Sequence, residues 1–215
     1  DETEGLTIGQ REPAMGLRGI PETEISFNNM IVHESMMVVP PSGLQRGFAG
    51  LMNAYNAQRV GAATVALGIA EGAYQHAIEY VKERHQFGRP IYEFQGLQWM
   101  LADMATQIAM AQTMVYKAAA SSEWGENQFP DMLIAAQAKI LASEMAIKVT
   151  SDALQLFGAR GYSRNFPLER MYRDARMFTI GGGTAQVLRN LIASKILDKK
   201  LPQSRDGYSQ LEKTS

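Results

Sequence analysis

Residues 58–105 read QRVGAATVALGIAEGAYQHAIEYVKERHQFGRPIYEFQGLQWMLADMA. Apolar side chains in this stretch recur mostly every three to five positions, which is typical of amphipathic helices. Gly88 and Pro90 interrupt the repeat, and such residues commonly end a helix. We therefore expect one long helix over about 46–84 and a second over about 93–122. The apolar positions of the first helix are Leu51, Tyr55, Val65, Ile69, Tyr74, Ile78 and Val81.

The remainder of the chain divides into further helices and one segment of different character. The spacing predicts a third helix over about 130–157 and a last helix over about 184–197, with a short helix LERMYRDARM between them. The first forty-odd residues instead contain several prolines and the stretch TEISFNNMIVHESMMVV, which predicts one or two strands. Because two short strands do not form a stable sheet alone, this segment is either an arm lying on the helices or the end of a sheet domain. The predicted fold is an all-α, up-down helical bundle preceded by a short β segment.

Composition excludes several classes of function. A net charge of −1 and a pI of about 6.4 give no electrostatic reason to expect nucleic acid or an anionic membrane surface as a partner. The chain has no cysteine, which excludes disulfides, thiolate metal sites and a cysteine nucleophile. His33, His76 and His85 lack the spacing that places two ligands on one helix face, so no metal site is predicted. No apolar run reaches the roughly 20 residues that span a bilayer, and the acidic opening differs from a signal peptide, so we expect a soluble protein.

Two glycine-containing turns have the chemistry to bind an anion. In TIGGGTAQVLRN, Thr184 is placed to cap a helix whose free N–H groups and dipole favour an anion or a hydrogen-bond acceptor. In ERHQFGRPI, Arg84 and Arg89 flank the turn and could clamp phosphate oxygens. Each motif alone also fits a simpler interpretation. The first would be a capped turn between helices, and the second a cationic helix end that compensates its own dipole.

Five motifs occur in a fixed order along the chain. They are MGLRGIPETEISFNNMIV, the stretch at 58–105 quoted above, QLFGARGY, ERMYRDARM and GGGTAQVLRN. Together they resemble the acyl-CoA dehydrogenase family, and the resemblance covers roughly Met15 to Ile196. It implies FAD as cofactor, an acyl-CoA thioester as substrate, and a homo- or hetero-oligomer, commonly a tetramer. It also implies an electron-transfer flavoprotein as a partner, and a bacterial cytoplasmic or mitochondrial matrix location.

The same resemblance implies a domain division and assigns residues to roles. Residues 1–45 would be the end of a middle β domain with its linker, 46–200 the helical bundle that binds FAD and acyl-CoA, and 201–215 a polar tail. The cofactor-binding positions implied are Arg84, Gln86, Phe87, Gln95, Gln155, Gly158, Ala159, Thr184 and Gln186. The substrate-binding positions implied are Tyr55, Asn56, Arg59 and Gly183. Two of these depart from the family pattern, since Ala159 replaces a glycine and Asn56 replaces a frequent aspartate.

The proton-abstracting glutamate of the family has no counterpart here. Most members carry it in the last glycine turn and a minority on the first long helix, and the matching positions are Gly182 and Gln58. An amide cannot act as a carboxylate base near neutral pH. Three accounts stay open: an engineered Glu→Gln change at position 58, a natural member with chemistry such as desulfination of a sulfinyl acyl-CoA, and a non-catalytic helical subunit of a heteromeric complex. We favour the natural member with non-standard chemistry.

Overall fold

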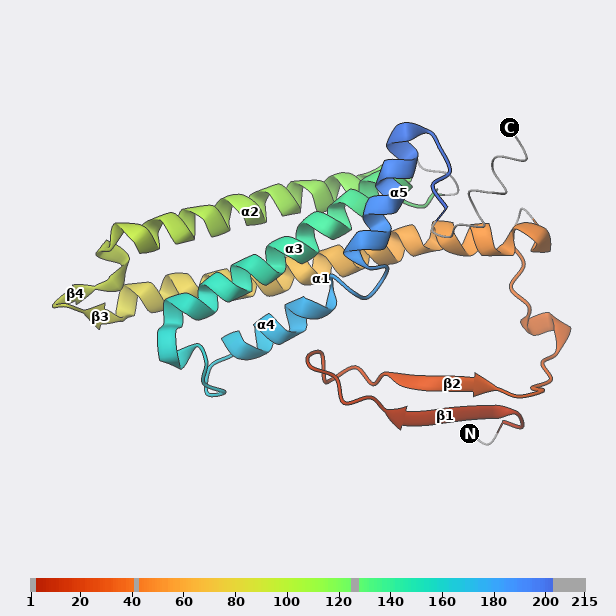
Figure 1. The fold of residues 1–215 in the computed structure, drawn as a ribbon, viewed down its shortest axis with the longest axis horizontal. Helices are drawn as coiled ribbons and strands as arrows, with labels where there is room; N and C mark the ends of the chain where they lie inside the picture. The colour runs from red at the N-terminus through yellow and green to blue at the C-terminus, as the bar shows by residue number, and fades with distance from the viewer. Residues whose placement is uncertain (1–2, 41–42, 125–127, 203–215) are drawn as a thin grey trace.

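Three long helices form the body of the molecule, and successive helices run in opposite directions (Figure 1). They are α1 (Gly47–Glu83), α2 (Gln95–Ala120) and α3 (Met132–Phe157). Two shorter helices, α4 (Leu168–Met177) and α5 (Ala185–Leu197), pack mainly on α3. The expected all-α bundle is therefore confirmed. The computed structural model describes residues 3–40, 43–124 and 128–202, and the polar tail expected at 201–215 falls almost wholly outside them.

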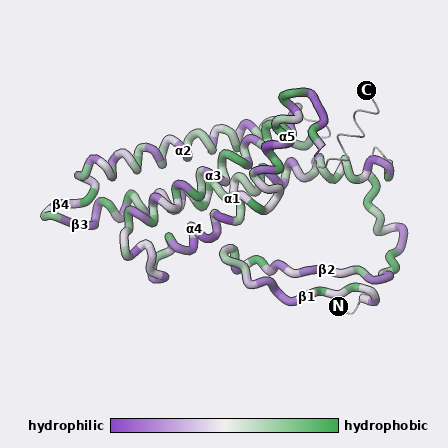
Figure 2. Tube along the Cα trace, in the orientation of Figure 1, coloured by the Kyte–Doolittle hydropathy of each residue, from purple (hydrophilic) through white to green (hydrophobic). Residues whose placement is uncertain are grey.

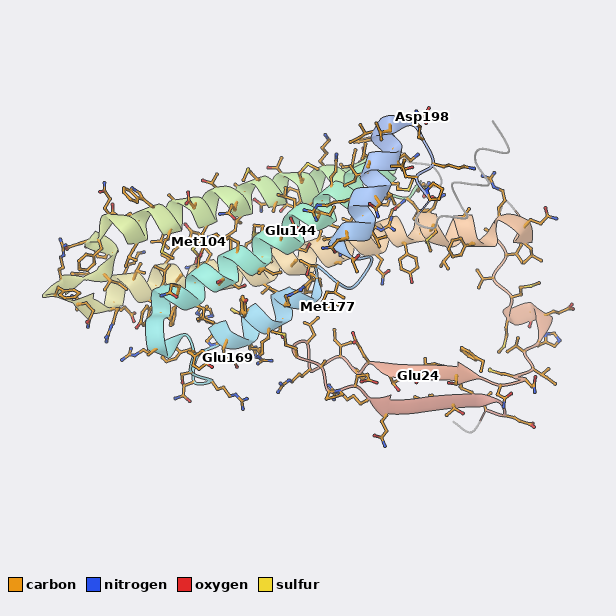
Figure 3. The ribbon with its side chains drawn as sticks, viewed as in Figure 1. Glu24, Met104, Glu144, Glu169, Met177 and Asp198 are labelled. Atoms are coloured by element: carbon orange, nitrogen blue, oxygen red, sulfur yellow. The ribbon has the colours of Figure 1, made fainter. Side chains whose placement is uncertain are left out.

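The core is built on small side chains that let α1 and α3 lie close together. Fully buried alanines recur along both helices at spacings that keep them on one face. Larger apolar side chains from α2 close the third side, with Met104 fully buried between the helices (Figure 3). We call the alanine contact between α1 and α3 the alanine seam. Its members are Ala63, Ala66, Ala70, Ala73 and Ala77 on α1 and Ala135, Ala138, Ala142, Ala146 and Ala153 on α3.

Two helix starts are fixed by side-chain caps. Asp131 accepts a hydrogen bond from the backbone N–H of Ile134 at 2.9 Å, and Thr184 accepts one from Val187 at 3.2 Å. Such caps satisfy N–H groups that have no partner within the helix. Helix α4 differs from the others in being mostly hydrophilic (Figure 2). It still docks by burying Leu168 and Ala175.

The N-terminal segment is a two-stranded antiparallel hairpin that lies apart from the three long helices (Figure 1). Strand β1 (Leu6–Arg11) pairs with β2 (Thr23–Phe27), so that Leu6 lies opposite Phe27. The sequence predicted strand structure at β2. It did not predict β1, because polar and apolar residues alternate only weakly there. Residues 34–36 form a short 3-10 helix, η1 (Glu34–Met36), in place of a second strand.

The segment between the two strands attaches the hairpin to α4. The backbone N–H of Leu17 donates to Oδ1 of Asp174 at 2.6 Å, and Nη1 of Arg173 donates to the carbonyl oxygen of Met15 at 2.6 Å. Gly16 lies between these two bonds, directly against the α4 backbone. The hairpin is therefore held at one end by charged side chains of the bundle.

Candidate functional site

A cavity of about 520 Å³ lies where the C-terminal ends of α1 and α3 meet. It brings together five of the nine positions that the sequence assigned to a cofactor. These are Arg84, Gln86, Gln155, Gly158 and Ala159. The remaining lining residues are mainly apolar, among them Ile91, Leu97 and Met100. A guanidinium, two amides and an apolar wall suit a ligand that has both phosphate oxygens and a flat ring.

Local backbone structure explains how these side chains reach one cavity. Helix α1 ends at Glu83, and the next two residues turn outward into a small hairpin, β3 (His85–Gln86) with β4 (Arg89–Pro90). Helix α3 ends at Gly158, whose φ of 58° is readily adopted by glycine. Tyr80 and Phe157 stack between the two helix ends with ring centroids 4.0 Å apart. That stacking fixes the distance between Arg84 and Gln155 across the cavity.

The hairpin tip projects beyond the ends of the helices (Figure 1). Phe87 lies at this tip with φ of 53° and is 91% exposed. Gln95, the first residue of α2, is also exposed, and neither residue lines the cavity. Two of the assigned cofactor positions therefore face outward from the described residues.

The second group of assigned positions is the turn between α4 and α5. Gly182 and Gly183 have φ values of 69° and 96°, which residues with a side chain rarely adopt. Thr184 then caps α5, and Gln186 lies exposed in its first turn. A Cβ at Gly182 would meet only Cε of Lys139, at 4.0 Å. Of the three glycines in this turn, Gly182 is the one with open space where a side chain would be.

Lys139 is a functional candidate that sequence reasoning missed. It lies on α3 with no exposed surface, and its Nζ donates to the carbonyl oxygen of Gly183 at 2.6 Å. Burial, together with the nearby charge of Arg59, lowers the pKa of Lys139 to about 8. A lysine among the alanines of AAQAKILASEMA is usually expected on a solvated helix face. No signal in the sequence distinguished it from the exposed Lys148 on the same helix.

Arg59 is the second buried cation of this region. The residue is 8% exposed, Nη1 donates to Oδ1 of Asn56 at 2.8 Å, and Nε is buried with no hydrogen-bond partner among the residues that the structure describes. Burial lowers the pKa of Arg59. Tyr55 and Gln58, by contrast, face outward on α1. The four positions assigned to the substrate or to the base on α1 therefore do not form one continuous surface.

The two groups of assigned positions lie far apart within one chain. Lys139, which bonds to Gly183 of the turn, and Gln155, which lines the cavity, are separated by 16 positions along α3, which corresponds to about 24 Å at the helical rise. A single extended ligand that contacted both groups of one chain would have to run along most of that helix. Two separate ligand contacts, one at each end of the bundle, fit the geometry better.

Two carboxylates of α3 and α4 are engaged in ion pairs. Glu144 on α3 bonds to Arg189 of α5 at 2.8 Å, and Glu169 bonds to Arg173 at 2.8 Å within α4. Figure 3 labels Glu144 and also Glu169, which lies at the end of α4 away from the turn. The hydrogen bond from Arg173 lowers the pKa of Glu169. Neither Gln58 nor Gly182 supplies a carboxylate. Within residues 3–40, 43–124 and 128–202, no group of three or more His, Cys, Asp or Glu side chains is placed to hold a metal ion.

Comparison with known proteins agrees with this geometry. The sequence profile described as "Acyl-CoA dehydrogenase, C-terminal domain" matches residues 45–197. The chain belongs to the acyl-CoA dehydrogenase family. A solved relative in that family, butyryl-CoA dehydrogenase from Megasphaera elsdenii, superposes with a TM-score of 0.85 at 38% identity. That alignment covers 92% of this chain and 50% of the other. The fold and the family that the sequence motifs implied are both confirmed.

Two curated relatives in the acyl-CoA dehydrogenase family differ in their sequence identity to this chain. The 3-sulfinopropanoyl-CoA desulfinase of Paraburkholderia xenovorans is 64% identical over 203 residues, covering 94% of this chain and 51% of that protein. The short-chain specific acyl-CoA dehydrogenase of Clostridium acetobutylicum is 43% identical over 192 residues, covering 89% and 49%. The chain thus spans about half the length of the relatives it matches. Among the described residues, no helix is both long and apolar enough to cross a membrane.

Proposed function

We propose that this chain supplies the helical half of an FAD-dependent enzyme that removes a sulfinyl group from an acyl-CoA thioester. The observation that carries the proposal is the absence of a carboxylate at both base positions, where Gln58 and Gly182 stand. The high identity to a 3-sulfinopropanoyl-CoA desulfinase supports the same chemistry. Desulfination needs no group that abstracts an α-proton. The absence of the glutamate base is therefore what this reaction would lead us to expect.

The residues present fit FAD at two places. At the first, Arg84 can bind pyrophosphate oxygens while the amides of Gln86 and Gln155 bond to the polar edge of a ring or sugar. At the second, the first turn of α5 offers N–H groups beyond those bonded to Thr184. Bound FAD would supply a redox-active ring beside the thioester. The residues of this chain would hold that ring in place.

We propose that a second copy of the chain brings one of these places to the flavin held by the other. The separation of about 24 Å along α3 between Lys139 and Gln155 and the outward-facing Phe87 favour a neighbouring subunit as the owner of the second contact. A homo-oligomer, commonly a tetramer in this family, satisfies that requirement. A non-catalytic subunit is less well supported, because the cavity retains its charged and amide residues.

The proposed reaction balances without an external oxidant. Cleavage of the C–S bond of 3-sulfinopropanoyl-CoA, with water donating hydroxide to sulfur and a proton to carbon, gives sulfite and propanoyl-CoA. No electrons leave the thioester, so an electron-transfer flavoprotein has no role in this reaction. Gln58 can hold the substrate by donating and accepting hydrogen bonds, but it takes no proton.

The direct test is sulfite release by the FAD-loaded assembly that contains this chain. We expect stoichiometric sulfite and propanoyl-CoA from 3-sulfinopropanoyl-CoA, and no anaerobic bleaching of the flavin by butanoyl-CoA. Bleaching by butanoyl-CoA without sulfite release would overturn the proposal in favour of an ordinary dehydrogenase. An Arg84→Gln variant should lose FAD, with exposed Arg164→Gln as its control. Unchanged FAD retention in the Arg84 variant would remove that residue from the cofactor site.

Gln58 can be tested separately. A Gln58→Glu variant places a carboxylate at the helix position used by a minority of the family, and we expect it to gain slow bleaching with butanoyl-CoA. The matched control is Gln75→Glu, which makes the same isosteric change at an exposed position farther along α1. If the Gln58 variant bleaches with no thioester, position 58 does not face the substrate.

We propose that residues 1–45 complete a middle β domain, that 46–200 bind FAD and acyl-CoA, and that 201–215 are a polar tail. The relatives named above come from bacteria, which supports a bacterial cytoplasmic location and gives no support to the mitochondrial alternative.

A further inference from the structure

Lys139 is a buried lysine whose ammonium group bonds to the backbone of the glycine turn. The residue has no exposed surface on α3, and its Nζ donates to the carbonyl oxygen of Gly183 at 2.6 Å. Within the part of the chain that the structure describes, it forms no ion pair with an acidic side chain. Lysines are almost never fully buried unless they are paired. The bond to Gly183 is therefore the contact that explains a lysine at this position.

The glycine turn needs an external contact to hold one conformation. Its first residues are anchored by two backbone N–H groups that donate to the carbonyl oxygen of Met177. Gly182 and Gly183 follow with φ values of 69° and 96°. Glycine passes between such conformations and the ordinary ones at little cost. Lys139 supplies the hydrogen bond that joins Gly183 to α3 and so restricts this freedom.

The same bond sets the direction of the peptide group between Gly183 and Thr184. A trans peptide group is planar, so its C=O and N–H bonds point in opposite directions, and the described residues contain no cis peptide bond. Because Lys139 draws the carbonyl oxygen toward α3, the N–H of Thr184 points away from α3. Among the described residues this N–H has no acceptor. It is a free donor whose direction Lys139 determines.

Lys139 can act on a ligand of the turn only through the backbone. It has no exposed surface, and it does not line the cavity beside Arg84. A Cβ built on Gly182 would lie 4.0 Å from Cε of Lys139, which is ordinary van der Waals contact. The lysine side chain therefore lies along the turn on the side that faces α3. The opposite side, toward which the N–H of Thr184 points, is the side left for a ligand.

We infer that Lys139 is a positioning residue for the cofactor, which turns the N–H of Thr184 toward an oxygen atom of bound FAD by holding the carbonyl group of Gly183. The inference rests on the proposed function, which places FAD against this turn. It gives a role in cofactor binding to a residue of α3 that touches no cofactor atom. Removal of the ammonium group should therefore weaken FAD binding without disturbing the helix that carries it.

The test measures hydrogen exchange at the backbone amide of Thr184 in the FAD-loaded assembly that contains this chain. In the wild type we expect FAD to slow this exchange at least about tenfold, because the N–H then has an acceptor. Lys139→Met keeps the side-chain length up to Cε and removes the donor. It should lose most of this protection, and its Kd for FAD should rise about 3- to 10-fold, as expected for one hydrogen bond. Exchange along α3 should stay as in the wild type.

Control variants separate positioning from packing. Lys148→Met makes the same exchange at a lysine that is 59% exposed on α3, and its Kd for FAD and its protection at Thr184 should match the wild type. Loss of protection along α3 in Lys139→Met would show a packing role and overturn the inference. Full protection at Thr184 in that variant would also overturn it. If Lys139→Met does not fold, Lys139→Gln decides, because its amide is one atom too short to reach Gly183.

Two further outcomes distinguish this inference from the proposed function. If the wild type binds FAD but the cofactor does not slow exchange at Thr184, the inference falls and the proposed function stands. If the wild-type assembly binds no FAD, the proposed function falls and takes the inference with it. Failure of both Lys139 variants to fold would assign the lysine to the stability of the bundle and also overturn the inference.

Discussion

Adding one methyl group at Gly16 should loosen the contact between the N-terminal segment and α4. A Cβ at this position would lie 2.5 Å from the carbonyl oxygen of Arg173 and 2.8 Å from the backbone nitrogen of Asp174. Real Cβ atoms essentially never come this close to another heavy atom, and the atoms met belong to helical backbone that cannot rotate away. The φ angle of Gly16 lies outside the left-handed region, so the clash alone decides the outcome.

The magnitude follows from the two hydrogen bonds that flank Gly16. Moving the segment away from α4 stretches the bond from Leu17 to Asp174 and the bond from Arg173 to Met15, each 2.6 Å long. Bonds to charged groups contribute about 1.5–3 kcal/mol when buried, and the contribution falls where solvent screens the charge. For this half-exposed pair we expect a total loss of about 1–3 kcal/mol. That corresponds to about 5- to 150-fold faster opening of the segment.

Hydrogen exchange at the backbone amide of Leu17 measures that opening directly. We expect its protection to fall by the same factor in Gly16→Ala. Gly19→Ala is the matched control, because a Cβ at Gly19 would have no atom within 4 Å. Equal exchange at Leu17 in both variants would refute the reasoning, and so would a loss of protection in α3 as large as that at Leu17.

Two further predictions concern stability. The pKa of Lys139 falls from 10.5 to about 8 on folding, so the unfolded chain binds more protons between those values and stability should rise with pH across them. The full shift equals about 3 kcal/mol, which solvent screening reduces to about 1–2 kcal/mol. Lys139→Met should therefore be more stable than the wild type in urea unfolding near pH 7, and its stability should not rise between pH 8 and 10.5. Identical slopes of stability against pH in the two proteins would contradict the prediction. Thr184→Ala should lower the free energy of unfolding by about 1 kcal/mol, because the cap on Val187 is lost. Thr113→Ala, on the exposed face of α2, should leave the free energy of unfolding unchanged. Equal losses in the two variants would show that the cap does not stabilise α5.

The helices were predictable from the sequence because their apolar repeats and caps are local. Expected ends lie within about two residues of those found for α1, α2 and α3, since Gly158 and Asp131 mark them chemically. Strand β1 escaped prediction because its stability comes from pairing with β2, which lies more than ten residues farther along the chain.

The candidate site was predictable only where backbone chemistry marks it. The glycine turn and Arg84 stand out as motifs in the sequence, and the structure places Arg84 and Gln155 in the lining of one cavity. Lys139 and the unpaired Nε of Arg59 could not be predicted, because their significance depends on burial between helices distant in the sequence. From the spacing of apolar residues alone, a single lysine in a helix is expected to face the solvent.

The alanine seam makes the bundle tolerant of mutation in one direction only. Truncating an alanine removes a single methyl group and leaves hardly any void, whereas enlarging one pushes apart two helix backbones that have no flexible side chains between them. Exchanges to glycine along α1 and α3 should cost about 1 kcal/mol through helix propensity and be tolerated more readily than exchanges to valine. Because the cavity and the glycine turn keep their positions through the spacing of these same helices, a single added branch at mid-bundle would be felt at both.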